Sequence, residues 1–170
     1  MADYFTHFSC LLNVGTLENA ARALELYNTL SAEGATEDPP SEGFLLSIEP
    51  QYGGKELWMR DDVTGDPERL IQFVKRCAAE FGLSGRWGFQ YANTCSRPRL
   101  DGFGGGAHAL DLATGETIAW IYTDGWLAEV LAGGRRTAAP PPARVRGRWA
   151  CRRRPGAGSR GSPRSRGRSG

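Results

Sequence analysis

Acidic and basic residues are segregated sharply along this chain. All 19 acids lie between Asp3 and Glu129, whereas twelve arginines, with no lysine and no acid, follow from Arg135 onward. The part before Arg135 carries nine lysines and arginines against those 19 acids, a net charge of −10, and the rest carries +12. Because the second part consists mainly of Arg, Pro, Gly, Ala and Ser, it has almost no aliphatic side chains with which to form a core.

This segregation predicts one acidic domain over residues 1–132 and a disordered basic tail over residues 133–170. Three interpretations of the tail are open. It is an arm that binds nucleic acid through its guanidinium groups, an out-of-frame or readthrough product of a GC-rich gene, or an arm that folds back on the acidic domain. Nucleic acid is therefore expected to bind only through the tail.

The periodicity of apolar residues alternates between the strand and helix types. We expect strands at 4–14, 44–48, 55–61, 86–93, 107–112 and 117–123, and helices at 17–33, 67–81 and 124–131. The second helix has the clearest limits, because Asp66 is a typical N-cap, Pro67 suits the first position and Gly82 suits the end. In the last helix, the expected core anchors are Trp126, Leu127, Val130 and Leu131.

This order predicts an α+β fold. The first six elements, β-α-β-β-α-β, are those of a ferredoxin-like fold, with an antiparallel sheet and helices on one face. A C-terminal hairpin and a short helix then extend it. The widely spaced cysteines, Cys10, Cys77, Cys95 and Cys151, form no zinc-binding pattern and indicate thiols in a reducing compartment.

The densest group of chemically versatile residues follows the strand at 86–93. We expect a partner or ligand to be bound by this loop and its flanks, through Thr94, Cys95, Ser96, Arg97, Arg99, Asp101, Gly104, Gly105, Gly106 and His108. The arginines and glycines could cradle an anionic group. The structural alternative is a glycine-rich connection in which Arg97 and Arg99 pair with Asp101 or Asp111.

Two further chemistries have weaker support in the sequence. Cys95 could act as a nucleophile with His7 or His108 as its base, but no spacing fixes their geometry. The acids Asp61, Asp62 and Asp66 lack the spacing of an EF-hand, and Asp66 is required as a helix cap, so we expect no metal site and no cofactor.

The stretch RWGFQYANTCSRPRLDGFGGGAH, from Arg86 to His108, resembles a signature of small uncharacterised proteins of bacteria, phages and plasmids. The flanking GDPERLIQFVKRCAAEFGL and IAWIYTDGWL are similar to the same pattern. The resemblance covers most of residues 5 to 131 and ends where the arginine-rich tail begins. It implies a setting on mobile elements but assigns no activity and no catalytic residue.

The leading hypothesis is a non-enzymatic interaction protein, an accessory or host-defence-inhibiting factor of a mobile element whose acidic surface meets an unidentified protein partner. A small anionic-ligand binder or enzyme that uses the Cys95–Gly106 loop is the alternative, and nucleic-acid binding by the tail is the third. The N-terminus has no basic, apolar signal pattern and no apolar stretch approaches about 18 residues, so we expect a cytoplasmic protein without a membrane partner.

Overall fold

The computed structural model describes residues 2–38 and 40–133, so the predicted tail lies outside the described residues except for Gly133. The elements follow one another in the predicted order. They are β1 (Tyr4–Asn13), α1 (Leu17–Ala35), β2 (Leu45–Ile48), the short 3₁₀ helix η1 (Pro50–Tyr52), β3 (Glu56–Arg60), α2 (Pro67–Phe81), β4 (Arg86–Cys95), β5 (Phe103–Asp111), β6 (Thr117–Tyr122) and α3 (Thr123–Leu131).

The strands form one six-stranded sheet in the order β2-β3-β1-β4-β5-β6, and every neighbouring pair is antiparallel. This confirms the predicted α+β class. The order of the whole sheet differs from that of the four-stranded ferredoxin-like fold, because β5 and β6 continue the sheet beyond β4. The predicted ferredoxin-like topology is therefore not confirmed.

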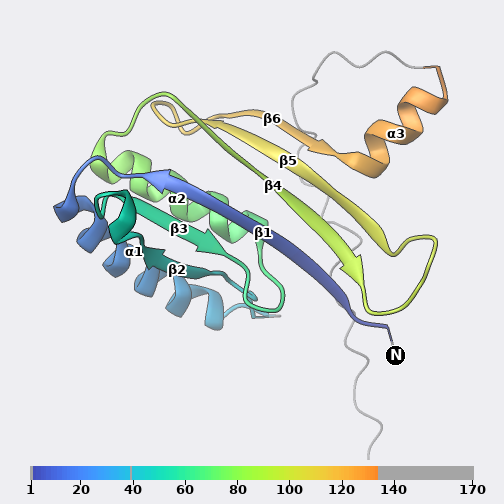
Figure 1. Ribbon diagram of the computed structural model, residues 1–170, viewed down its shortest axis with the longest axis horizontal. Coiled ribbons are helices and arrows are strands. Elements are labelled where there is room, and N and C mark those ends of the chain that lie inside the picture. The colour runs from blue at the N-terminus through green and yellow to red at the C-terminus, as the bar shows by residue number, and fades with distance from the viewer. Residues whose placement is uncertain (1, 39, 134–170) are drawn as a thin grey trace, which may run out of the picture.

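Helices α1 and α2 lie against one face of the sheet (Figure 1). The predicted limits of α2 are confirmed: the Asp66 carboxylate accepts hydrogen bonds from the backbone N–H groups of Glu68 and Arg69, and Gly82 ends the helix with a φ of 62°. The apolar face of α2 enters a core that includes Phe8, Leu12, Leu57, Met59, Phe73, Val74, Phe89 and Leu110. Because side chains alternate along a strand, the residues between these core positions point to the face of the sheet opposite α1 and α2.

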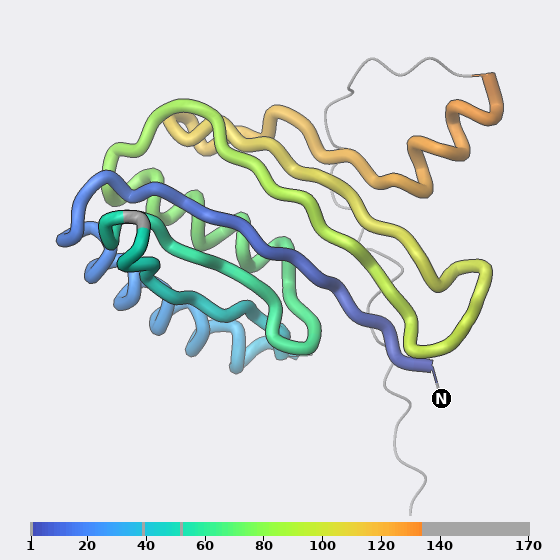
Figure 2. The backbone as a smooth tube through the Cα atoms, viewed as in Figure 1, coloured from blue at the N-terminus to red at the C-terminus, as the bar shows by residue number. Residues whose placement is uncertain are grey.

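One end of the sheet extends past α1 and α2. Strands β1, β4 and β5 run beyond these helices toward the N-terminus, and α3 stands at the same end (Figure 2). The predicted burial of α3 is wrong, because none of its residues is buried and Trp126, Leu127, Val130 and Leu131 are 41 to 78% exposed. The apolar spacing correctly predicts the helix, but the expected packing of its apolar side chains into the core is not found among the described residues.

Candidate functional site

The predicted loop begins where β4 ends, at Cys95, and it is joined to the N-terminus. The Ser96 backbone N–H donates to the Asp3 carbonyl over 2.9 Å, and the Asp3 N–H donates back to the Ser96 hydroxyl over 3.0 Å. These two bonds hold the loop beside the first residues of the chain. The loop is therefore positioned by a rigid strand and by a second, distant segment.

Arg99 forms a two-point ion pair with Asp101. Its Nε lies 2.8 Å from Asp101 Oδ1, and a terminal nitrogen lies 3.1 Å from Oδ2. This hydrogen-bonded pairing lowers the pKa of the Asp101 carboxyl. The pairing expected in the structural alternative is thus present for Arg99, and both side chains are about half exposed, so the pair contributes little to stability.

The three consecutive glycines lie in β5 and not in a loop. Gly104, Gly105 and Gly106 pair in register with Asn93, Ala92 and Tyr91 of β4. Gly105 has a φ of 145°, and a Cβ there would collide with the Tyr91 carbonyl oxygen. These glycines therefore permit close approach of two strands, and an anion cradle formed by a free glycine loop does not fit this arrangement.

His108 lies apart from the loop. It pairs in register with Phe89, six residues along β4 from Cys95, a separation of about 20 Å at the usual rise of a strand. Its side chain is buried between Phe89 and Trp120, with Nε2 3.0 Å from the Thr117 hydroxyl. It therefore cannot serve as a base for Cys95.

His7 instead joins two residues that the sequence did not connect. Its Nδ1 lies 2.8 Å from Asp61 Oδ2, and its Nε2 lies 3.2 Å from the Thr94 hydroxyl. Asp61 Oδ1 also accepts the backbone N–H of Phe8 over 2.8 Å. The sequence alone suggests a role for His7 only as a base for Cys95, and a role for Asp61 only as a metal ligand. The pairing of β1 with β4, and of Asp61 with Phe8, brings the three side chains together.

Native alkylation should distinguish the cysteines that the structure describes. Burial raises the pKa of Cys10 and of Cys77 to about 12, whereas Cys95 is partly exposed at the strand end. Because the thiolate is the reactive form, we expect iodoacetamide at pH 8 to modify Cys95 at least about tenfold faster than Cys77. Peptide mapping over time measures each rate. Equal rates in the native protein would contradict this assignment.

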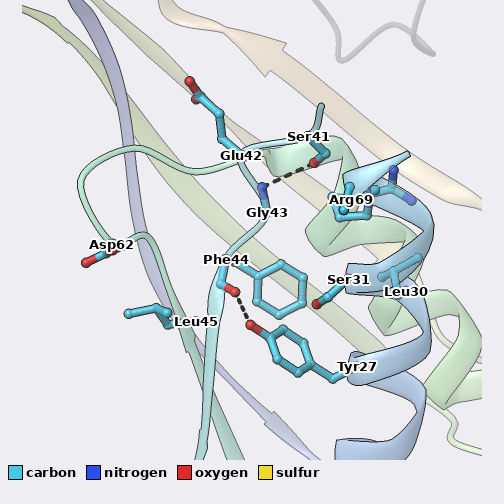
Figure 3. Close-up of a pocket in the computed structure, with 12 residues that line it drawn as sticks. Tyr27, Leu30, Ser31, Ser41, Glu42, Gly43, Phe44, Leu45, Asp62 and Arg69 are labelled. Atoms are coloured by element: carbon cyan, nitrogen blue, oxygen red, sulfur yellow. Dashed lines mark hydrogen bonds between the residues drawn. The ribbon is translucent and has the colours of Figure 1, made fainter. Parts of the chain in front are cut away.

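A cleft of about 290 Å³ lies between α1 and the segment that leads into β2 (Figure 3). The Tyr27 hydroxyl points toward Phe44 and donates to its carbonyl, and the two rings pack edge to face with centroids 5.2 Å apart. Both rings also contact Phe73 of α2. The aromatic side of the cleft therefore belongs to the core packing of α1 on α2.

The charged groups around this cleft do not favour an anionic ligand. Arg69 is buried, and its guanidinium is ion-paired with Glu37. Two further acids, Glu42 and Asp62, line the same cleft. The positive charge of Arg69 is thus already neutralised, which makes the cleft a weaker candidate than the end of β4.

No protein-family model matches the chain, and neither a curated protein nor a solved structure matches it. In the part of the chain that the structure describes, no three His, Cys, Asp or Glu residues are placed to hold a metal ion. Likewise, among these residues no helix is long and apolar enough to span a bilayer.

Proposed function

We propose that this chain is a protein-interaction module whose partner covers the extended end of the sheet. The observation that carries the proposal is α3, a helix with large apolar side chains and no buried residue. The strands β5 and β6, which lie next to α3, also carry exposed apolar side chains. We call this set the overhang surface, and it comprises Phe103, Ile121, Tyr122, Trp126, Leu127 and Leu131.

Exposed apolar side chains grouped in this way are typical of interaction sites. Phe103 is 77% exposed and Leu131 is 78% exposed, whereas single scattered apolar residues on a surface need no explanation. Thr123, the first residue of α3, donates its hydroxyl to the Gly105 carbonyl over 3.2 Å, so the helix is attached to β5. The exposed apolar groups of α3 and of the adjoining ends of β5 and β6 thus belong to the same end of the sheet, and the consecutive Ile121 and Tyr122 point to opposite faces of it.

The charge of the domain indicates the chemistry of the partner. Residues 1–134 carry a net charge of −10, which favours association with a basic protein surface. The Cys95–Gly106 loop would lie within or beside such an interface, because Phe103 belongs to both. A basic host enzyme blocked by an accessory protein of a mobile element is the sharper form of this proposal.

Loss of apolar area from the overhang surface should weaken binding without changing charge. We expect the double variant Leu127→Gln and Leu131→Gln to recover at least about tenfold less of a basic partner from bacterial lysate. The matched control is Val63→Gln, because Val63 is 62% exposed but lies outside the overhang surface. Quantitative mass spectrometry measures the amount of each captured protein. The capture is carried out with the full chain and with a version that ends at Gly134.

Three outcomes would overturn the proposal. Equal recovery by the double variant and by Val63→Gln would show that the overhang surface does not bind the partner. A dimer in light scattering that the double variant dissociates would make a second copy of the chain the occupant. Binding lost only on removal of the tail would instead support the nucleic-acid or tail-mediated alternative.

We further propose that β1 to β4, with α1 and α2, are a ferredoxin-like core to which the remaining elements were added. The partial order β2-β3-β1-β4, all antiparallel with the helices on one face, supports this division. It bears on function because the overhang surface belongs wholly to the added elements β5, β6 and α3. An experimental structure with α1 and α2 on opposite faces would contradict it.

A further inference from the structure

Three side chains from distant parts of the chain form a connected hydrogen-bonded row on the face of the sheet opposite α1 and α2. They are His7 of β1, Asp61 directly after β3, and Thr94 near the end of β4. The carboxylate-to-imidazole distance is 2.8 Å and the imidazole-to-hydroxyl distance is 3.2 Å. Both distances are within the range for a nucleophile, its base and the group that orients the base.

The chemistry of the partners determines where the protons lie. An ionised carboxylate only accepts, and Asp61 already accepts the Phe8 N–H at its other oxygen. His7 Nδ1 must therefore carry the hydrogen that Asp61 Oδ2 accepts. In the neutral imidazole, Nε2 then has the free lone pair, so it accepts the hydroxyl hydrogen of Thr94. This is the tautomer that removes a proton from a hydroxyl as the hydroxyl attacks.

The row is accessible from solvent. The His7 side chain is 43% exposed, whereas Asp61 is only 15% exposed. Ala92 pairs in register with His7 on the adjacent strand, so a small side chain adjoins the imidazole. Thr94 is half-buried, and Phe5 and Phe103 pair in register with it on the two adjacent strands. A substrate group would therefore reach the imidazole and the hydroxyl from the face of the sheet opposite α1 and α2, while the carboxylate stays covered.

We propose that Thr94 is a nucleophile toward carboxylic esters, with His7 as its general base and Asp61 as a positioning residue. This is a second function of the chain, independent of the interaction assigned to the overhang surface. If the three side chains served only to stabilise the fold, their hydrogen bonds would be sufficient. A nucleophile also requires a hydroxyl that a substrate can approach and a correctly oriented base.

The reaction is an ester hydrolysis with water as the second reactant. Thr94 Oγ1 forms a bond to the acyl carbon as its proton moves to His7 Nε2. The bond from the acyl carbon to the alcohol oxygen breaks, and the alcohol leaves with that proton. Water then attacks the acyl group on Thr94 and gives a proton to His7. The acid is released as this proton returns to Thr94.

The probe for this site is an alkyl fluorophosphonate applied to the full chain. Thr94 Oγ1 would bond to phosphorus, the phosphorus–fluorine bond would break, fluoride would leave, and the hydroxyl proton would move to His7. We expect a single adduct by intact mass, located on Thr94 by peptide mapping. Thr94→Ser keeps a hydroxyl in place and should be labelled within about threefold of the natural rate.

Variants of each partner separate reactivity from structure. Thr94→Val keeps the shape and should abolish labelling, and His7→Gln should slow it at least about tenfold. Asp61→Asn should also slow it at least about tenfold, because an amide donor would favour the other tautomer of His7. Asp62→Asn is the matched control, since Asp62 is an exposed neighbour outside the row, and it should react normally.

The proposal is overturned if the folded natural chain gives no adduct on Thr94. It is also overturned if His7→Gln and Asp61→Asn have the melting temperature of the natural chain and are labelled as fast as the natural chain. Should His7→Gln fail to fold, Thr94→Val and Thr94→Ser still decide the case. Both change the same half-buried side chain, but only Thr94→Val removes its hydroxyl. Phe103 pairs in register with Thr94, so the independent control is the double variant Leu127→Gln and Leu131→Gln in α3. This variant should leave labelling unchanged, so failure here is distinguishable from failure of the interaction proposal.

Discussion

Replacement of Gly106 by alanine is expected to lower the free energy of unfolding by about 3 kcal/mol, the upper end of the range for overpacking. A Cβ at this position would collide with the Ile121 carbonyl oxygen of β6 and would lie 2.7 Å from the Tyr91 hydroxyl of β4. That hydroxyl also accepts a hydrogen bond from Trp120 Nε1 over 3.1 Å. Relief of the collision therefore requires the strands on both sides of β5 to move.

Urea unfolding of the full chain measures this effect, and Gly125→Ala is its matched control. Gly125 lies in α3, where an added Cβ would meet no atom within 4 Å, and alanine should stabilise that helix by about 0.5 to 1 kcal/mol. The two changes add the same methyl group with opposite expected signs. If Gly106→Ala lowered the free energy of unfolding by less than about 0.5 kcal/mol, the result would contradict the close approach of β4, β5 and β6.

Local signals in the sequence predicted most of the fold. The limits of α2 follow from Asp66, Pro67 and Gly82, each of which acts on its own turn of backbone and needs no tertiary information. Alternation in β4 correctly placed Trp87, Phe89 and Tyr91 on the buried face. Such patterns are sufficient for element type and for which face of each element is buried.

Positions that depend on distant partners were not predictable in the same way. The sequence predicts a loop at the glycines 104–106, because glycine is a weak strand former, but their pairing with β4 overrides that preference. The apolar spacing of α3 predicts burial in the core, but these side chains are exposed, because a pattern cannot show whether another element covers the helix. Both errors concern tertiary contacts and not local conformation.

The candidate site shows the same limit. Thr94 was predicted because it follows a strand, but His7 and Asp61 are 54 positions apart and share no motif. Only the antiparallel pairing of β1 with its two neighbours brings them to one place. The alternating faces of β1 would have placed His7 opposite Phe8, but they do not indicate which residue of β3 or β4 meets it.

His108 is expected to make stability depend on pH between about 6.5 and 4. Burial lowers its pKa to about 4, and among the described residues its Nδ1 has no hydrogen-bond partner, so the folded protein keeps the ring neutral. The unfolded chain takes up a proton near the ordinary value of about 6.5. The stability contributed by the neutral ring is therefore complete above pH 6.5 and is lost as the pH falls toward 4.

From pH 7.5 to pH 5 this difference amounts to about 2 kcal/mol of unfolding free energy. Asp101 and Glu33 have lowered pKa values, so their contribution is lost at a lower pH than this window. Urea unfolding at both pH values tests the expectation against His108→Gln, which keeps a polar partner for Thr117 but does not titrate. The variant should be less stable at pH 7.5 and should lose about 2 kcal/mol less than the natural chain on acidification. If both proteins lost the same free energy of unfolding between pH 7.5 and pH 5, protonation of His108 would not be the cause of the pH dependence.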